Sequence, residues 1–180
     1  MKIYLLIFAF VITGYTNGFS QLYMTRTGYI GFYSKAPLED IKADNSQVYA
    51  VVDVEKKNLA FTLLMKGFLF AKELQQEHFN ENYVESDKFP KATFSGSFTG
   101  DITPGKDGLY NVHVKGNLMI HGVTKEVEIP ATLELKDKKL LGNGTLVIRP
   151  EDYQITIPSI VRDKIAKEVT ITIRIECNPR

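Results

Sequence analysis

The sequence lacks the features that mark several large classes of protein. It has one cysteine, Cys177, in 180 residues, so it has no internal disulfide and no zinc site made of thiolates alone. Its 22 basic and 21 acidic residues leave a net charge of +1, without the positive excess that binds nucleic acid or anionic membranes. Tryptophan is absent, but 11 phenylalanines and 9 tyrosines are available for a core. With 44% hydrophobic and 24% charged residues, the composition predicts one soluble folded domain with no nucleic-acid partner.

The longest hydrophobic run occupies residues 3–12 (IYLLIFAFVI) and is too short for a membrane-spanning helix, which needs about 20 residues. No stable membrane span is therefore expected. Lys2 precedes the run, and the small residues Gly18 and Ser20 lie at the third and first positions before Gln21, a pattern typical of a cleaved secretory signal. We expect residues 1–20 to be removed as a signal peptide and residues 21–180 to form one periplasmic or secreted domain; an anchor or a first strand is the alternative. Loss of Lys2 brings the formal net charge from +1 to zero, which leaves homodimerisation open.

Most of the remaining chain alternates between apolar and polar residues, the pattern of a β-strand with one buried face. The alternation is clearest at residues 110–120, 126–135 and 169–177, and weaker at residues 23–34, 47–55, 58–66, 92–100 and 139–149. The pair His121-Gly122 lies between two of these runs, where a two-residue turn requires positive φ. Eight strands in a chain of this length predict an all-β fold with antiparallel strands around one core.

Two segments interrupt the β pattern. Residues 72–83 are rich in helix formers, and Leu74, His78 and Phe79 recur at roughly helical spacing. A second short helix is expected near residues 159–166. Both segments join strands at the ends of the sheet, where they could plug or gate a barrel.

The residue types that carry catalysis or bind metals do not form a recognisable motif. His78, His113 and His121 have no partner at metal-binding spacing, and no nucleophile elbow, phosphate loop or dinucleotide fingerprint occurs. Glu77 and Glu81 lie four residues apart on one helical face, a spacing more typical of a solvated surface than of a cation site. We therefore expect no catalytic residue, no metal site and no cofactor. An enzyme that acts on a lipid through Glu77, His78 and Glu81 is the weakest alternative.

The apolar faces of the predicted strands contain almost no polar atoms, and small residues interrupt them at Ala50, Gly116, Ala131, Gly142 and Gly144. An eight-stranded barrel either fills itself with side chains or holds one small ligand, and small inward residues favour the second outcome. A cavity lined in this way stays dry and accepts a hydrocarbon chain, because each buried methylene contributes about 0.8 kcal/mol. The alternative is a filled sandwich whose glycines serve twist and bulges.

The expected ligand contacts fall into two groups, the walls of an apolar tunnel and a set of side chains that close its mouth. The predicted wall residues are Leu63, Phe94, Leu118, Ile120 and Ile171. The predicted mouth residues are Phe68, Phe70, Leu74 and Phe79.

Three segments resemble a known family. LMIHGVTKEV at residues 118–127 and FPKATF at residues 89–94 are similar to a hairpin and a strand entry of the YceI-like family, and HFNENYVES at residues 78–86 resembles the lid region of a small secreted subgroup. The resemblance extends from about Tyr23 to Cys177. It implies an extended, antiparallel, lipocalin-like barrel in the periplasm, and members of the family bind polyisoprenoids, isoprenoid quinones or long-chain fatty acids and amides. The family's usual phenylalanine and histidine on the first strand appear here only as GFYS at residues 31–34, so no head-group contact is transferred from that strand.

These observations leave two main hypotheses besides the enzyme. The first is a carrier or sequestering protein for a long-chain apolar or amphiphilic small molecule. The second is a ligand-free structural or stress-response module with a filled barrel. A cavity between the inward faces distinguishes them.

Overall fold

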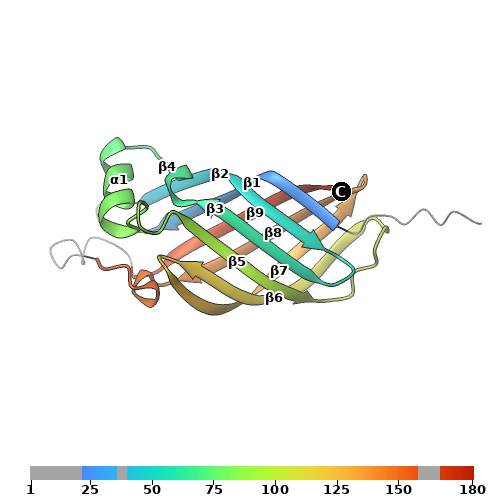
Figure 1. Cartoon of the computed structure of the whole chain (residues 1–180). Helices are drawn as coiled ribbons and strands as arrows, with labels where there is room; N and C mark the ends of the chain where they lie inside the picture. The colour runs from blue at the N-terminus through green and yellow to red at the C-terminus, as the bar shows by residue number, and fades with distance from the viewer. Residues whose placement is uncertain (1–21, 36–39, 158–166) are drawn as a thin grey trace, which may run out of the picture.

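The computed structural model describes residues 22–35, 40–157 and 167–180 (Figure 1). Eight long antiparallel strands follow one another around a barrel in the order β1-β9-β8-β7-β6-β5-β3-β2, and pairing of β1 with β2 closes it. The strands are β1 (Leu22–Ser34), β2 (Ile41–Asp53), β3 (Asn58–Leu64), β5 (Lys91–Thr99), β6 (Gly108–Ile120), β7 (Val123–Lys136), β8 (Lys139–Ile148) and β9 (Val169–Pro179). The predicted all-β, eight-stranded, lipocalin-like barrel is confirmed. The predicted signal peptide and the predicted helix at residues 159–166 lie outside the described residues.

The first and last described strands are neighbours. β1 pairs with β9 from Tyr23↔Pro179 to Tyr33↔Thr170, and the Arg180 N–H donates to the Leu22 carbonyl at 2.9 Å. The two ends of the domain therefore meet on the barrel wall.

Short helical elements and one short strand cover one end of the barrel, which we call the α1 end (Figure 1). They are η1 (Met65–Gly67), β4 (Leu69–Phe70), α1 (Glu73–His78) and η2 (Phe79–Tyr83). The predicted helix at residues 72–83 is present, but its second half is a π-helix in which the Val84 N–H donates to the Phe79 carbonyl. Across the described residues, no helix combines the length and hydrophobicity needed to cross a bilayer.

Asn45 lies where β2 changes partners. β2 pairs with β3 through Tyr49–Asp53 and with β4 through Ala43 and Asp44. Between these two ladders, the fully buried Asn45 donates from Nδ2 to the Leu64 carbonyl at 3.0 Å and accepts the Gln47 N–H at 2.8 Å. The amide therefore supplies hydrogen bonds that strand pairing does not make at this point.

β7 and β8 pair over only part of their length. Their ladder runs from Lys136↔Lys139 to Ala131↔Gly144, and residues 123–130 of β7 do not pair with residues 145–148 of β8. Both strands remain fully paired to their other neighbours, β6 and β9. Pro130, the first residue of β7 that is not paired with β8, has no backbone N–H to donate to a ladder. We call this point of separation the β7–β8 fork; the two strands part from here toward the α1 end.

The turn between β6 and β7 has the predicted conformation. His121 and Gly122 have φ of 51° and 74°, and they connect the last pair of the ladder, Ile120↔Val123. A Cβ atom at Gly122 would lie 2.7 Å from Cε1 of Phe89, so the turn requires glycine for space as well as for its backbone angle.

Gly122→Val is therefore expected to destabilise the domain more than the same change at Gly105. Gly105 has a similar φ of +73° but nothing within 4 Å of an added Cβ, so Gly105→Val carries only the backbone strain, about 1–2 kcal/mol. Gly122→Val adds displacement of the Phe89 ring, about 1–3 kcal/mol more. Urea unfolding of both variants measures the difference, and equal losses would show that Phe89 does not pack against the turn.

Candidate functional site

The barrel encloses a cavity of about 360 Å³. This volume falls within the roughly 300–1,000 Å³ of typical small-molecule sites. All eight long strands contribute to its wall, and nearly every lining side chain is apolar. The polar residues among them are Ser34, Gln75 and His78, together with Thr132 and Asn143, whose side chains face outward from the strands. A chamber of this composition is suited to a hydrocarbon chain.

Eight of the nine predicted contact residues line the cavity. They are Leu63, Phe68, Phe70, Phe79, Phe94, Leu118, Ile120 and Ile171. Leu74 does not line it; its side chain is 60% exposed. The expectation that Leu74 and Phe79 share an inward face was wrong because residues five apart lie on different sides of a helix with 3.6 residues per turn. Gln75, His78 and Phe79, at spacings of three and four, form the face that lines the cavity.

The opposite end of the barrel from α1 holds a buried hydrophobic cluster. Val54, Leu140 and Cys177 of this cluster are each at most 2% exposed and do not line the cavity, whereas its members Val52 and Phe98 do. The cavity therefore lies between this closed end and the elements at the α1 end.

Four phenylalanines form an aromatic cluster beneath α1. The Phe79 ring centroid lies 5.5 Å from Phe32, 5.7 Å from Phe68 and 5.0 Å from Phe70. Each such pair contributes about 0.5–1.5 kcal/mol beyond its buried area. Phe32 was not predicted as a contact residue, although its place between Ile30 and Ser34 in an alternating strand is a signal that could have found it. The cluster closes the cavity on the α1 side.

Phe94 owes its position to two glycines. Gly96 and Gly116 are paired across β5 and β6, and Cβ atoms on them would lie 2.9 and 2.7 Å from Cζ of Phe94. The ring therefore lies over the bare backbone of both strands. The space above Gly116 is thus filled by Phe94 and does not enlarge the lumen.

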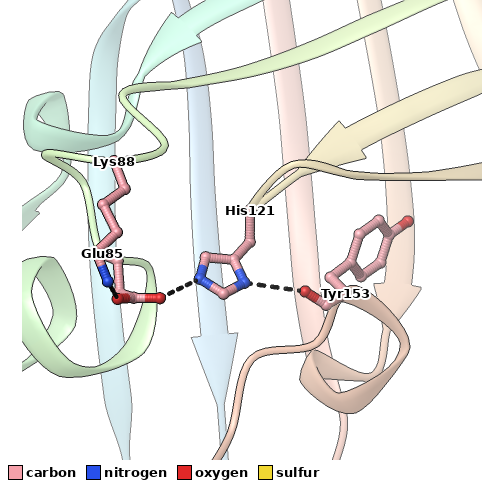
Figure 2. Close-up of polar contacts among 4 residues, drawn as sticks. All are labelled: Glu85, Lys88, His121 and Tyr153. Atoms are coloured by element: carbon pink, nitrogen blue, oxygen red, sulfur yellow. Dashed lines mark hydrogen bonds and ion pairs between the residues drawn. The ribbon is translucent and has the colours of Figure 1, made fainter.

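A polar network joins three connections at the α1 end (Figure 2). Nδ1 of His121 lies 3.2 Å from the carbonyl oxygen of Tyr153 in η3 (Pro150–Tyr153), and Nε2 lies 3.1 Å from Oε2 of Glu85. The other Glu85 oxygen pairs with Lys88. The hydrogen bond from Lys88, and next the one from His121, hold the pKa of the Glu85 carboxyl below its ordinary value.

Both ring nitrogens of His121 face oxygen acceptors, and its side chain is only 10% exposed. The sequence-based assignment of His121 to a turn was correct but incomplete, since the residue also holds η3 and the segment before β5 against the β6–β7 turn. These partners lie 36 and 32 positions away, so no local pattern reveals them.

The residues of the enzyme alternative do not converge. All three side chains are exposed, and His78 lines the cavity while Glu77 and Glu81 do not. No group of three or more histidine, cysteine, aspartate or glutamate side chains suited to a metal ion occurs in the described part of the chain.

Comparison with known proteins agrees with this architecture. The model of the YceI-like domain matches residues 26–177. Among solved structures, the chain is similar to BcnA of Burkholderia cenocepacia, with 20% identity and a TM-score of 0.68 over 83% of this chain and 95% of that one. It is also similar to a polyisoprenoid binding domain from Saccharophagus degradans implicated in plant cell wall breakdown, with 13% identity and a TM-score of 0.73 over 89% and 99% of the two chains.

A third similar structure is the YceI protein of Campylobacter jejuni, with 16% identity and a TM-score of 0.64 over 81% of this chain and 89% of that one. At these identities the solved structures establish the shared fold alone. A comparison with curated protein sequences found no match. The family model covers most of the chain and confirms the resemblance seen at residues 89–94 and 118–127, so the protein belongs to the YceI-like family.

Proposed function

We propose that this protein is a periplasmic carrier or sequestering protein for a long-chain amphiphilic lipid, an isoprenoid quinone, a polyprenol or a fatty acid or amide. The observation that carries the proposal is the apolar cavity of about 360 Å³ inside the barrel. A hydrocarbon chain in this cavity would leave water at a gain of about 25 cal/mol per Å² of apolar surface. The similarity to a polyisoprenoid binding domain supports the same class of ligand.

The competing functions have less support. A filled structural barrel needs side chains in the space that the cavity occupies. An enzyme needs convergent polar groups, but Glu77 and Glu81 are exposed on the outer side of their helical segment. We therefore infer a binding protein without catalytic activity.

A thermal-shift series on delipidated protein tests the proposal. The probes are ubiquinone analogues, polyprenols and long-chain fatty acids. The control is butyrate, which has the carboxylate of a fatty acid but lacks its long chain. A ligand at a hundred times its Kd stabilises the native state by about 2.7 kcal/mol, which corresponds to about 5–10 °C in Tm for a domain of this size. If no long-chain probe raises Tm above the butyrate control, the carrier function is wrong.

Phe79→Ser is expected to speed ligand release at least several-fold while the barrel persists. Phe79 contacts three other rings over the cavity, and serine both removes these contacts and admits water. Leu74→Ser is the matched control, because Leu74 lies on the same helical segment but faces solvent. Stopped-flow displacement of a fluorescent fatty acid gives both rates. Equal release from the two variants would mean that the aromatic cluster does not retain the ligand.

A further inference from the structure

The internal cavity and a second hollow adjoin where β7 and β8 separate. At the β7–β8 fork, an open hollow of about 560 Å³ lies on the outer face of the barrel. This hollow and the internal cavity share five lining residues: Ala131, Thr132, Asn143, Gly144 and Ile173. The inward positions of this shared wall include Ala131, which carries only a methyl group, and Gly144, which carries no side chain. From Pro130 and Thr145 onward, no ladder joins the two strands.

The outer hollow differs chemically from the cavity. Its outward side chains are amides, hydroxyls, one imidazole and one guanidinium: Asn111, His113, Thr132, Asn143, Thr145, Thr172 and Arg174. They come from four neighbouring strands, in rows set by the pairs Asn111↔Thr132, Thr132↔Asn143 and Asn143↔Arg174. No carboxylate is among the described residues that line the hollow.

Arg174 is a cation without an ion-pair partner among the described residues. Its guanidinium lies 5.4 Å from the centroid of the Tyr29 ring, and the Tyr29 hydroxyl in turn donates to Asp44 on β2. Two other cations on the barrel wall are paired: Lys115 with Glu126 at 3.0 Å and Lys139 with Glu176 at 2.5 Å. At the α1 end, Arg149 pairs with Glu168 at 3.4 Å. The guanidinium that lines the hollow therefore has no carboxylate, among the described residues, that would compete with a bound anion.

We propose that the fork is the head-group site of the lipid, and that it takes an anionic oxygen group, a carboxylate or a phosphate, on Arg174. This inference rests on the proposed function. The hydrocarbon chain occupies the apolar cavity, and the head emerges sideways between β7 and β8 into the hollow. Guanidinium groups bind carboxylates and phosphates through charge-assisted hydrogen bonds, and the neighbouring amides and hydroxyls supply further donors.

The test compares three ligands with one chain and different heads: dodecanoic acid, dodecanol and dodecyl phosphate. Isothermal titration calorimetry on the delipidated chain gives each Kd. The unsubstituted protein is expected to bind the acid and the phosphate about tenfold more tightly than the alcohol. Arg174→Gln is expected to remove this preference and to leave the Kd of the alcohol unchanged, which also shows that the variant is folded.

Arg149→Gln is the matched control, an arginine at the other end of the cavity, and it is expected to keep the preference. The inference is overturned if Arg174→Gln keeps the preference, if Arg149→Gln abolishes it instead, or if the unsubstituted protein has none. In each of these outcomes the unsubstituted protein still binds all three ligands, so the proposed function stands. Failure of all three to bind the unsubstituted protein would instead contradict the proposed function.

Discussion

Leu140→Ala is expected to lower the free energy of unfolding by about 3–5 kcal/mol, the upper part of the range for leucine truncation in a packed core. Leu140 is fully buried in the closed end of the barrel, opposite Leu135 on β7 and Cys177 on β9. It is not one of the residues that line the cavity. The strands around it are continuously paired, so the surroundings cannot collapse into the space that the side chain leaves.

Leu118→Ala is the matched control, because it makes the same chemical change in the hollow part of the barrel. Leu118 is half-buried and already faces the cavity, so its truncation is expected to cost only about 1–2 kcal/mol. Urea unfolding followed by circular dichroism gives both values. Similar losses at the two sites would contradict the division into a solid closed end and a hollow α1 end.

Cys177 is expected to react with thiol reagents about a thousandfold more slowly in the native protein than a free cysteine does at pH 8. The side chain is fully buried, and burial, with a smaller contribution from Glu176, raises the pKa of its thiol to about 12. A raised pKa leaves almost no thiolate at pH 8, and the thiolate is the reactive form. Mass spectrometry after timed exposure to iodoacetamide measures the labelling.

Val147→Cys provides the exposed comparison for this experiment, since Val147 lies on β8 and is 52% exposed. The introduced thiol should be labelled quickly while Cys177 in the same molecule stays unmodified. Labelling of Cys177 should begin only when urea unfolds the barrel. Rapid labelling of both thiols under native conditions would show that β9 opens readily at the closed end.

Alternation alone was enough to predict the eight long strands, because each has one face on the lumen and one in solvent. Alternation failed to predict the start of β2, where residues on both faces of the strand are polar. β2 begins at Ile41, six residues before the predicted start, since Asp44, Asn45 and Ser46 conceal the pattern. Asn45 is buried for its hydrogen bonds rather than for hydrophobicity, and only the neighbouring strands reveal that.

The walls of the site were predictable for the same reason as the strands. Side chains of one parity on a closed barrel must face its lumen, so the residues predicted from strands line the cavity. Leu74 was misplaced because its five-residue spacing from Phe79 puts the two side chains on different sides of a helix with 3.6 residues per turn. The fork could not be foreseen, although Pro130 is visible in the sequence, because an alternating pattern carries no information about where two strands stop pairing.

The meeting of β1 with β9 has a consequence for how the domain is assembled. Hairpins such as β6–β7 form from residues close in sequence, but the seam between β1 and β9 joins residues at opposite ends of the domain. Closing so long a loop lowers the entropy of the chain before the contacts between β1 and β9 can stabilise it. Topologies dominated by distant contacts therefore fold slowly. The lumen therefore comes into existence only when the last strand docks, so a lipid cannot be enclosed by a partly synthesised chain.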